Sequence, residues 1–320
     1  MSDRRPRVRV CLFGLGRAGS VLHLPALRRI REIEIVAACD PDPEARARAG
    51  RTRLIASVDE ALGLPYDAAI VATPVSTHQA VAAAALAAGR HVYVEKPMTS
   101  SLRDAHALAE QARASGLVVQ VGYAYRFHPL WQRVRRLVDD GLLTPPFHAR
   151  GAFSTARAGA GWAQPLVDVA THHVDLVSWL TGATPVAVDA RRDGQLGVRW
   201  DDGSELDGLY QEASPQDSLE LEDDRQCVVV DRLRATRLRL SGPRPASAVL
   251  PSPVLVRARL GRSGWEPSFE RALRGFVCAI RAGTPAAPGV EAGVAGVAVA
   301  EAVLQSLATG QTAAVPARDG

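Results

Sequence analysis

Short apolar runs alternate with segments of helical spacing along the first part of the chain. The runs that predict strands are Val8–Phe13, Glu34–Cys39, Tyr66–Ala72, His91–Val94 and Leu117–Val121. Because these runs are continuously apolar, they are typical of a parallel sheet that helices cover on both faces. The alternation of strands with helices therefore predicts an α/β domain.

Two helix starts in this domain carry capping signals. Residues 76–79 have the form of a capping box ahead of an Ala-rich segment that Gly89 ends. Ser101 precedes the next helical segment, which ends near Gly116. We expect Ser76 and Ser101 to accept hydrogen bonds from the first turns of these helices.

After Gly122 the pattern changes from buried strands to alternating ones. Short alternating segments with turn signals fill residues 185–240, with a hairpin turn at Asp202-Gly203. Helical spacing is found at residues 129–140, 166–180, 269–280 and 291–307, and a further strand is predicted at 147–154. We therefore expect two domains, residues 1–124 and residues 125–320, the second of α+β type.

Composition excludes several classes of protein. Hydrophobic residues make up 47% and charged residues 22%, which is typical of a globular chain, and no run reaches the ~18 consecutive apolar residues of a membrane span. The N-terminus is Arg-rich without the apolar region of a signal peptide. The net charge is +4, from 38 basic and 34 acidic residues that are intermixed, so we expect no nucleic-acid partner. The cysteines have no metal-binding spacing and fit a reducing cytoplasm: Cys11, Cys39, Cys227 and Cys278.

One basic residue differs from all the others. The 38 basic residues are 37 arginines and a single lysine, Lys96. Arginine cannot replace lysine where a compact charge is needed. Lys96 follows the strand that ends at Val94, and in an open parallel sheet the carboxyl ends of the strands line the ligand crevice. We expect Lys96 to stabilise negative charge on a substrate oxygen.

A glycine-rich turn joins the first strand to the first helix. It contains Gly14, Gly16 and Gly19 in the spacing GxGxxG, with Arg17 and Ala18 between them. The first glycine permits a tight turn, the second lets the backbone approach a pyrophosphate, and the third lets the helix pack close to the strand. These five residues are our first candidates for cofactor binding.

Asp40 ends the second strand, about 20 residues further on, where a ribose 2′-hydroxyl would be bound. Its carboxylate would repel the 2′-phosphate of NADP, although Arg46 and Arg48 could reach that position. The sequence therefore favours NAD over NADP. Further cofactor contacts are expected after the third and fourth strands, from Thr73, Pro74, His78, Glu95 and Lys96.

Asp168, His172 and Asp175 are spaced to share one face of a helix. A carboxylate beside an imidazole is the arrangement of a tuned general acid–base. The same spacing also fits a polar helix face with a core histidine, and both interpretations remain open from spacing alone. His173 lies off this face and is expected to be structural. No third soft ligand lies at a matching distance, so we predict no metal site.

These motifs together resemble one known family. Beside the glycine turn they include Asp40-Pro41-Asp42, Thr73 to His78, Glu95-Lys96-Pro97 and Gly122 to Phe127, with Asp168-x-Ala170-x-His172-x-x-Asp175 later in the chain. The sequence is similar to the glucose–fructose oxidoreductase / inositol dehydrogenase / rhizopine catabolism (Gfo/Idh/MocA) family over nearly its whole length.

The resemblance implies a Rossmann domain followed by an α+β domain with an open, mostly antiparallel sheet, a nicotinamide cofactor, and a homodimer or homotetramer. It implies that Lys96 and His172 are catalytic, that Asp168 assists His172, and that Pro97 follows a cis peptide. It places the substrate beside Tyr123, Arg126, Trp162 and Gln164. The chain departs from the family pattern at residues 162–165, where paired glycines are common, and at Ala170.

The function implied is hydride transfer between a nicotinamide and a CH–OH carbon of a sugar, nucleotide sugar or cyclitol, by a cytoplasmic dehydrogenase or ketoreductase. Two alternatives remain. A non-catalytic dinucleotide-binding sensor would keep the three glycines but need neither Lys96 nor His172. A redox-assisted glycosidase or epimerase would recycle its NAD.

Overall fold

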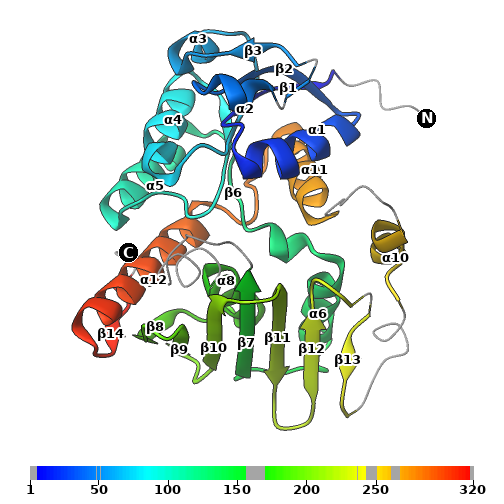
Figure 1. The fold of residues 1–320 in the computed structure, drawn as a ribbon, viewed down its shortest axis with the longest axis vertical. Helices are drawn as coiled ribbons and strands as arrows, with labels where there is room; N and C mark the ends of the chain where they lie inside the picture. The colour runs from blue at the N-terminus through cyan, green and yellow to red at the C-terminus, as the bar shows by residue number, and fades with distance from the viewer. Residues whose placement is uncertain are drawn as a thin grey trace. The chain divides into compact units, whose positions relative to one another are not determined.

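The computed structural model describes residues 6–47, 49–50, 52–155, 170–235, 237–242, 251–260 and 267–317. The described residues form two compact units, one made of residues 1–124 with 268–297 and the other of residues 125–267 with 298–320. The last two long helices follow all but the last strand of the second sheet in sequence, yet α11 (Pro267–Ala282) and the first part of α12 (Val290–Thr309) belong with the first unit. Figure 1 shows the elements of each unit.

The first unit contains a six-stranded parallel sheet in the order β3-β2-β1-β4-β5-β6. Its strands are β1 (Val8–Phe13), β2 (Ile33–Cys39), β3 (Leu54–Ile55), β4 (Ala68–Val71), β5 (His91–Val94) and β6 (Val119–Val121). This order is that of a Rossmann fold, in which the order of strand addition reverses between β1 and β4. All five long strands lie where the apolar runs predict them.

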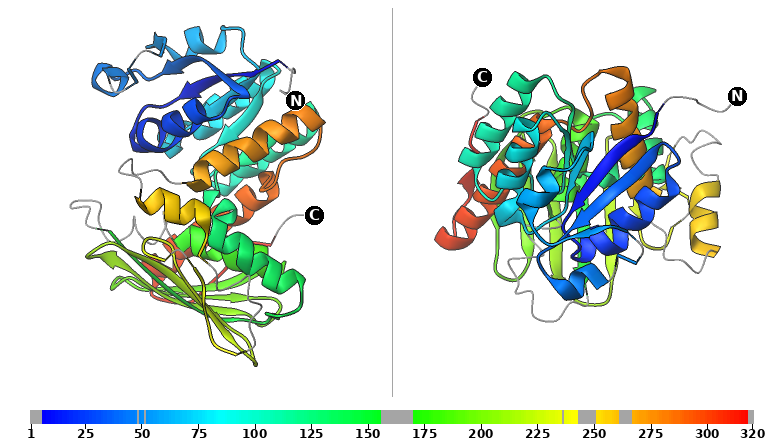
Figure 2. Two further views of the ribbon diagram at one scale, coloured as in Figure 1. Left: turned by 90° about the vertical axis from the view of Figure 1, so that its right-hand side faces the viewer. Right: turned by 90° about the horizontal axis from the view of Figure 1, so that it is seen from above.

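Helices cover both faces of this sheet, as the continuous apolar strands require (Figure 1). They are η1 (Ala18–His23), α1 (Leu24–Arg29), α2 (Pro43–Ala47), α3 (Val58–Leu62), α4 (Val75–Ala87), α5 (Leu102–Ser115) and α11 (Pro267–Ala282). In the views of Figures 1 and 2, α4 and α5 lie on one side of the sheet and α1 and α11 on the other.

The two capping predictions have different outcomes. Ser101 caps α5 as predicted, since its hydroxyl accepts a hydrogen bond from the Asp104 N–H at 3.2 Å. The capping box at Ser76 is wrong, because α4 already begins at Val75, directly after Pro74. The Thr77 hydroxyl instead donates to the Pro74 carbonyl at 2.8 Å. Pro74 is the N-cap residue, and its carbonyl also accepts from the Thr77 N–H at 2.9 Å.

The second unit contains an eight-stranded sheet in the order β13-β12-β11-β7-β10-β9-β8-β14. Its strands are β7 (His148–Thr155), β8 (Pro185–Ala190), β9 (Gln195–Trp200), β10 (Glu205–Glu212), β11 (Gln216–Glu222), β12 (Cys227–Asp231), β13 (Arg239–Leu240) and β14 (Ala313–Ala314). Only the β7–β10 pair is parallel, so the expected open, mostly antiparallel sheet is confirmed.

Alternation along the strands buries one face of this sheet and exposes the other. In β11, Asp217, Leu219 and Leu221 are buried while the residues between them are partly exposed. The helices of this part are η2 (Ala124–Phe127), α6 (Pro129–Asp139), α8 (Ala170–Thr181) and α10 (Pro253–Leu260). Helix α6 packs against β12, and α8 packs against β7, β9 and β10.

Helix α12 (Val290–Thr309) runs from the first unit into the second. Within the described ranges it is the one helix long and apolar enough to cross a membrane, with a mean hydropathy of 1.4. Of its most apolar window, 56% is buried inside the structure. A core helix passes the same test of length and composition, so this is weak evidence for a membrane span.

Candidate active site

The glycine turn after β1 has the geometry that a dinucleotide-binding turn needs. Gly14 has a φ of +93°, and a Cβ there would lie 2.4 Å from the Ala72 carbonyl oxygen. A Cβ at Gly19 would lie 1.9 Å from the Gly14 carbonyl oxygen. A Cβ at Gly16, in contrast, would meet no atom within 4 Å. Gly14 and Gly19 therefore shape the turn, and Gly16 leaves open space over its backbone.

The Asp40 carboxylate faces this same turn. Its Oδ2 accepts a hydrogen bond from the Leu15 N–H at 2.7 Å and its Oδ1 accepts one from the Asp42 N–H at 2.9 Å. A carboxylate has about four lone-pair sites, so Asp40 retains acceptor capacity for a ribose hydroxyl. Arg46 donates to the Asp40 carbonyl at 2.6 Å and to the Pro41 carbonyl at 2.9 Å, so its guanidinium is engaged with the backbone. Arg48 lies outside the described residues.

His78 connects the loops that follow β4 and β5. The ring is buried, with Nε2 2.8 Å from the Thr73 carbonyl oxygen and Nδ1 2.9 Å from the Pro97 carbonyl oxygen. A neutral imidazole carries a single N–H, so it can donate to only one of these carbonyls at a time. His78 thus holds the ends of two neighbouring strands together at the carboxyl edge of the sheet.

Lys96 follows β5 at this edge, and the Lys96–Pro97 peptide is cis, as the family resemblance implies. Behind it, the buried Glu95 side chain contacts His23 Nε2 through Oε1 at 2.7 Å and accepts from the Lys96 N–H through Oε2 at 3.1 Å. Burial raises the pKa of the Glu95 carboxyl, but the hydrogen bond and charge of His23 outweigh it, so the pKa lies below its ordinary value. The Glu95 side chain thus points to His23 rather than to open surface.

Tyr123, expected at the substrate, is 1% exposed and belongs to the hydrophobic core of the first unit. A Cβ at Gly296 would lie 1.8 Å from its hydroxyl oxygen, so Gly296 gives the ring the room it occupies.

Two of the predicted cofactor residues have exposed side chains, Pro74 and Arg17, which lies beside Gly16. The C-terminal edge of this sheet therefore collects the predicted cofactor residues Gly14, Gly16, Arg17, Ala18, Gly19, Asp40, Thr73, Pro74, His78, Glu95 and Lys96.

In the second unit, Asp168, Trp162 and Gln164 lie outside the described residues. His172 lies in the first turn of α8, where its buried ring stacks flat on Tyr125, with centroids 4.0 Å apart and an interplanar angle of 7°. Asp175 lies one turn further along α8, three residues from His172. That carboxylate receives two hydrogen bonds from Arg126, at 2.6 and 2.9 Å.

The pair of Arg126 and Asp175 is largely buried, with side chains 16% and 6% exposed. Burial raises the pKa of the Asp175 carboxyl above its ordinary value, although Arg126 acts in the opposite direction. Arg126, expected to bind substrate, is therefore engaged with a carboxylate of its own unit.

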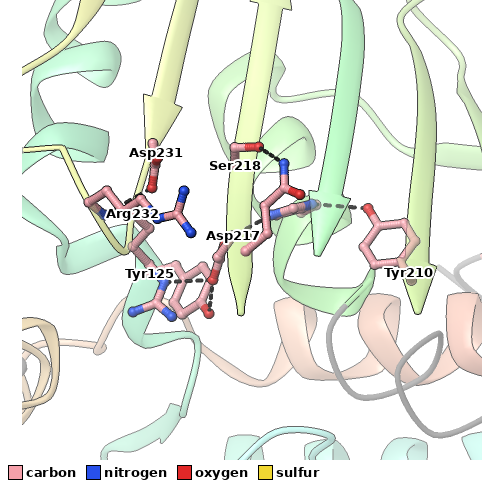
Figure 3. A network of polar contacts seen from close by, with 9 residues as sticks. Tyr125, Tyr210, Asp217, Ser218, Asp231 and Arg232 are labelled. Carbon is pink, nitrogen blue, oxygen red and sulfur yellow. Dashed lines mark hydrogen bonds and ion pairs between the residues drawn. The ribbon is translucent and has the colours of Figure 1, made fainter. Parts of the chain in front are cut away.

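A second carboxylate, Asp217, organises a polar cluster that sequence reasoning missed (Figure 3). It accepts from the Tyr125 hydroxyl at 2.6 Å and from Arg232 Nε at 2.7 Å, and it lies 3.3 Å from His173 Nε2. The other nitrogen of His173 contacts the Tyr210 hydroxyl at 3.0 Å. One signal could have found it: Asp217 falls in the inward phase of a strand whose other inward residues are leucines.

The first unit fits a nicotinamide dinucleotide. Gly16 leaves its backbone open to a pyrophosphate, and Asp40 keeps acceptor capacity beside it. Within the described ranges, no group of three or more His, Cys, Asp or Glu side chains could hold a metal ion.

Comparisons with known proteins agree with this geometry. A family model described as "Oxidoreductase family, NAD-binding Rossmann fold" matches residues 8–123, and a GFO/IDH/MocA C-terminal domain model matches residues 131–212. Inositol 2-dehydrogenase 3 of Saccharopolyspora erythraea is 27% identical over 98% of this chain and 96% of its own length. UDP-N-acetylglucosamine 3-dehydrogenase of Acidithiobacillus ferrooxidans is 36% identical over 44% of each chain.

Solved structures show the same two-unit fold. The UDP-N-acetylglucosamine 3-dehydrogenase from Acidithiobacillus ferrooxidans matches with a TM-score of 0.80 and 25% identity over 95% of this chain and 98% of that one. The myo-inositol 2-dehydrogenase from Lactobacillus plantarum matches with a TM-score of 0.79 and 19% identity over 98% and 100%. The chain therefore belongs to the Gfo/Idh/MocA family of NAD-binding oxidoreductases.

Proposed function

We propose that this protein is an NAD-dependent dehydrogenase that acts on a CH–OH carbon of a polyhydroxylated ring, a cyclitol, a sugar or a nucleotide sugar. The observation that carries the proposal is the position of Lys96. Lys96 is the only lysine of this chain, and it follows strand β5 at the carboxyl edge of the Rossmann sheet. The glycine turn and Asp40 lie at the same edge. Inositol 2-dehydrogenases and a UDP-N-acetylglucosamine 3-dehydrogenase are among its relatives.

The residues of the glycine turn would hold the pyrophosphate, and Asp40 would accept from the ribose. NAD, when bound, supplies or accepts the hydride. Thr73, Pro74 and His78 would shape the edge beside it, and Glu95 would act indirectly, by fixing the backbone of Lys96.

His172 is assigned to the proton of the substrate hydroxyl, as general base in oxidation and general acid in reduction. Lys96 stabilises negative charge on the reacting oxygen. Asp168 assists His172, and Trp162 and Gln164 contact the substrate. Tyr123 and Arg126 stay proposed substrate contacts, Tyr123 from the core of the first unit and Arg126 from its pair with Asp175 in the second.

We further propose that residues 1–124 are the cofactor domain, completed by α11 and the first part of α12, and that the rest of residues 125–320 is the substrate domain. The exposed face of the eight-stranded sheet would form a homodimer or homotetramer, and the protein would act in the cytoplasm.

The test is a substrate panel with purified full-length protein. Myo-inositol, scyllo-inositol and UDP-N-acetylglucosamine are incubated with NAD, and NADH is followed by its absorbance. Oxidation of at least one polyol, lost in the Lys96→Arg and His172→Ala variants, supports the proposal. If the wild type turned over no polyol and no member of a wider set of sugars, and NAD binding survived both substitutions, the sensor would be favoured instead.

A further inference from the structure

We propose that Tyr125 is a positioning residue for His172, and that the buried Asp217–Arg232 ion pair holds Tyr125 in place. The inference rests on the proposed function, because it concerns the residue assigned to proton transfer. It gives a role in that function to Tyr125, Asp217 and Arg232, to which the sequence motifs gave none.

The stack between Tyr125 and His172 restricts the imidazole. Tyr125 comes from η2 and His172 from α8, and both side chains are buried, 8% and 9% exposed. With ring centroids 4.0 Å apart and planes 7° from parallel, the phenol covers one face of the imidazole. Rotation of the imidazole about its Cβ–Cγ bond would drive it into the phenol ring. Tyr125 therefore fixes the plane in which the two ring nitrogens of His172 lie.

Tyr125 is itself held by contacts from two strands of the sheet. Its hydroxyl donates to Asp217 on β11 at 2.6 Å. The Arg232 residue, directly after β12, donates to the same carboxylate oxygen at 2.7 Å, and its guanidinium carbon lies 4.4 Å from the Tyr125 ring centroid. The Arg232 N–H also donates to the Asp217 carbonyl at 2.9 Å. Figure 3 shows these three side chains converging.

Asp217 remains ionised in this setting. Burial raises the pKa of its carboxyl, but Arg232, His173 and the Tyr125 hydroxyl together hold the pKa well below its ordinary value. A charge-assisted hydrogen bond to such an anion is short and strong. The phenol is therefore held at its far end by a fixed charge, while its face supports the imidazole.

The Tyr125 ring also faces any positive charge that His172 acquires. A phenol that donates to a carboxylate gains electron density on its ring, and a cation over an aromatic face is stabilised. The other charged groups around this part of α8 occur in pairs, Asp217 with Arg232 and Asp175 with Arg126. His173 and Tyr210 complete the cluster on the side of Asp217 away from Tyr125, and Asp168 lies outside the described residues.

The network offers a matched control. Tyr125→Phe removes the hydroxyl that bonds to Asp217 and keeps a ring to stack on His172. Tyr210→Phe removes another buried hydroxyl from the same cluster, but the ring and hydroxyl of Tyr210 contact His173, whereas the Tyr125 ring stacks on His172. Tyr125→Leu removes the stack altogether. A purely structural role for the cluster would make the two Phe variants equivalent.

The first experiment follows His172 without any substrate. Full-length protein is labelled with ¹³C at histidine Cε1, the His172 signal is identified by its loss in His172→Asn, and it is titrated with pH. We expect Tyr125→Phe to move the His172 titration to lower pH and Tyr210→Phe to leave it in place. A titration that is the same in wild type, Tyr125→Phe and Tyr125→Leu would overturn the proposal.

The second experiment measures turnover of a polyol that the wild type oxidises. We expect Tyr125→Phe to lower kcat roughly tenfold and Tyr125→Leu up to ~10²-fold, below the ~10²–10⁴-fold that an acid–base residue contributes. The KM for NAD should be unchanged, and Tyr210→Phe should keep kcat within about threefold. An equal loss of kcat in both Phe variants would contradict a specific role for Tyr125. If His172→Asn turned over normally, the proposed function would fail, and the titration would still decide whether Tyr125 holds His172.

Discussion

Among the described residues, each unit has a buried carboxylate in contact with a histidine, Glu95 in the first and Asp217 in the second, and these two are held by different partners. In the first unit Glu95 contacts His23 and the N–H of the adjacent Lys96. In the second, Asp217 pairs with Arg232, whose charge is permanent, and also contacts Tyr125 and His173. Both environments keep the carboxyl pKa low.

The difference suggests different tasks. Glu95 fixes a stretch of backbone, the turn that presents Lys96. Asp217 fixes a side chain, the Tyr125 ring that supports His172. A guanidinium partner suits the second task, because the fixed ion pair keeps Asp217 charged as the acceptor of the Tyr125 hydroxyl. The predictions that follow from this contrast run from the largest expected effect to the smallest.

The largest effect is expected at His172, the residue of the second unit that is assigned to proton transfer. His172→Ala should lower kcat by ~10²–10⁴-fold, as for other positioned acid–base residues. The wild-type pH–rate profile should show one ionisation that this substitution removes. His173→Ala, which leaves the Tyr125 stack in place, should act mainly through stability, with kcat within about tenfold of wild type. Steady-state kinetics and circular dichroism on both variants decide this, and equally mild effects would refute the assignment of His172.

The second prediction compares the two carboxylates directly. Asp217→Asn leaves the Arg232 charge buried and uncompensated, which typically costs about 3–5 kcal/mol. Glu95→Gln retains an acceptor for the Lys96 N–H and should cost less, about 1–3 kcal/mol. Urea unfolding followed by circular dichroism at one protein concentration measures both. A larger loss for Glu95→Gln would reverse the proposed contrast.

The same pair predicts the acid limit of stability. Both carboxyls have a folded-state pKa below the ordinary value, and that ordinary value is 4.5 for a glutamate such as Glu95 and 3.8 for an aspartate such as Asp217. Each therefore contributes stability that is complete above its ordinary pKa and is lost as the pH falls toward the lower, folded one. We expect wild-type stability to fall below about pH 4, and to fall less steeply in Asp217→Asn, which has one such group fewer.

The third prediction tests the turn that Glu95 supports. Lys96→Arg keeps the charge but replaces a compact ammonium with a planar, larger guanidinium. We expect kcat to fall by ~10²–10³-fold, the usual loss when one stabilising donor is removed from a reacting oxygen. Affinity for NAD, measured by fluorescence titration, should change much less than kcat. A Lys96→Arg enzyme with near-normal kcat would exclude the catalytic role.

The contrast also explains what could be predicted from the sequence. The first unit's candidate residues follow strands that share one sheet edge, so local motifs were sufficient to place Gly14, Asp40 and Lys96 together. Their geometry depends on backbone conformation within a few residues, as at Gly14, whose φ is positive. Short-range chemistry of this kind leaves a signal in sequence spacing.

The second unit's cluster depends on pairings between distant elements. Arg126 and Asp175 are 49 positions apart, and Tyr125 and Asp217 are 92 apart. Helical spacing placed Asp175 beside His172, but a long-range ion pair to Arg126 competes for that carboxylate. Such partners cannot be deduced from spacing on one helix, because several elements must pack before they meet.

The smallest effect is expected at Asp40, which we propose contacts the ribose of the cofactor. Its carboxylate accepts from the Leu15 N–H of the glycine turn, and a carboxylate at this place would repel a 2′-phosphate. Asp40→Asn removes the charge and retains an oxygen that can accept from the Leu15 N–H. We expect the ratio of NADP affinity to NAD affinity to rise about tenfold, which corresponds to about 1.4 kcal/mol.

Asp42→Asn is the matched control for this change. It removes the same charge two residues away, from an exposed carboxylate that accepts from the Glu44 N–H at 2.9 Å. The Asp42 carboxylate is bonded to the start of α2 and not to the glycine turn. Removing its charge should therefore change the ratio of NADP to NAD affinity by no more than about twofold, since salt screens a charge effect that acts at long range. Fluorescence titration of NADH and NADPH against wild type and both variants gives the three ratios. Tighter binding of NADPH than NADH by the wild type would disprove the role of Asp40, and an equal shift in both variants would assign the preference to net charge instead of to a contact with the ribose.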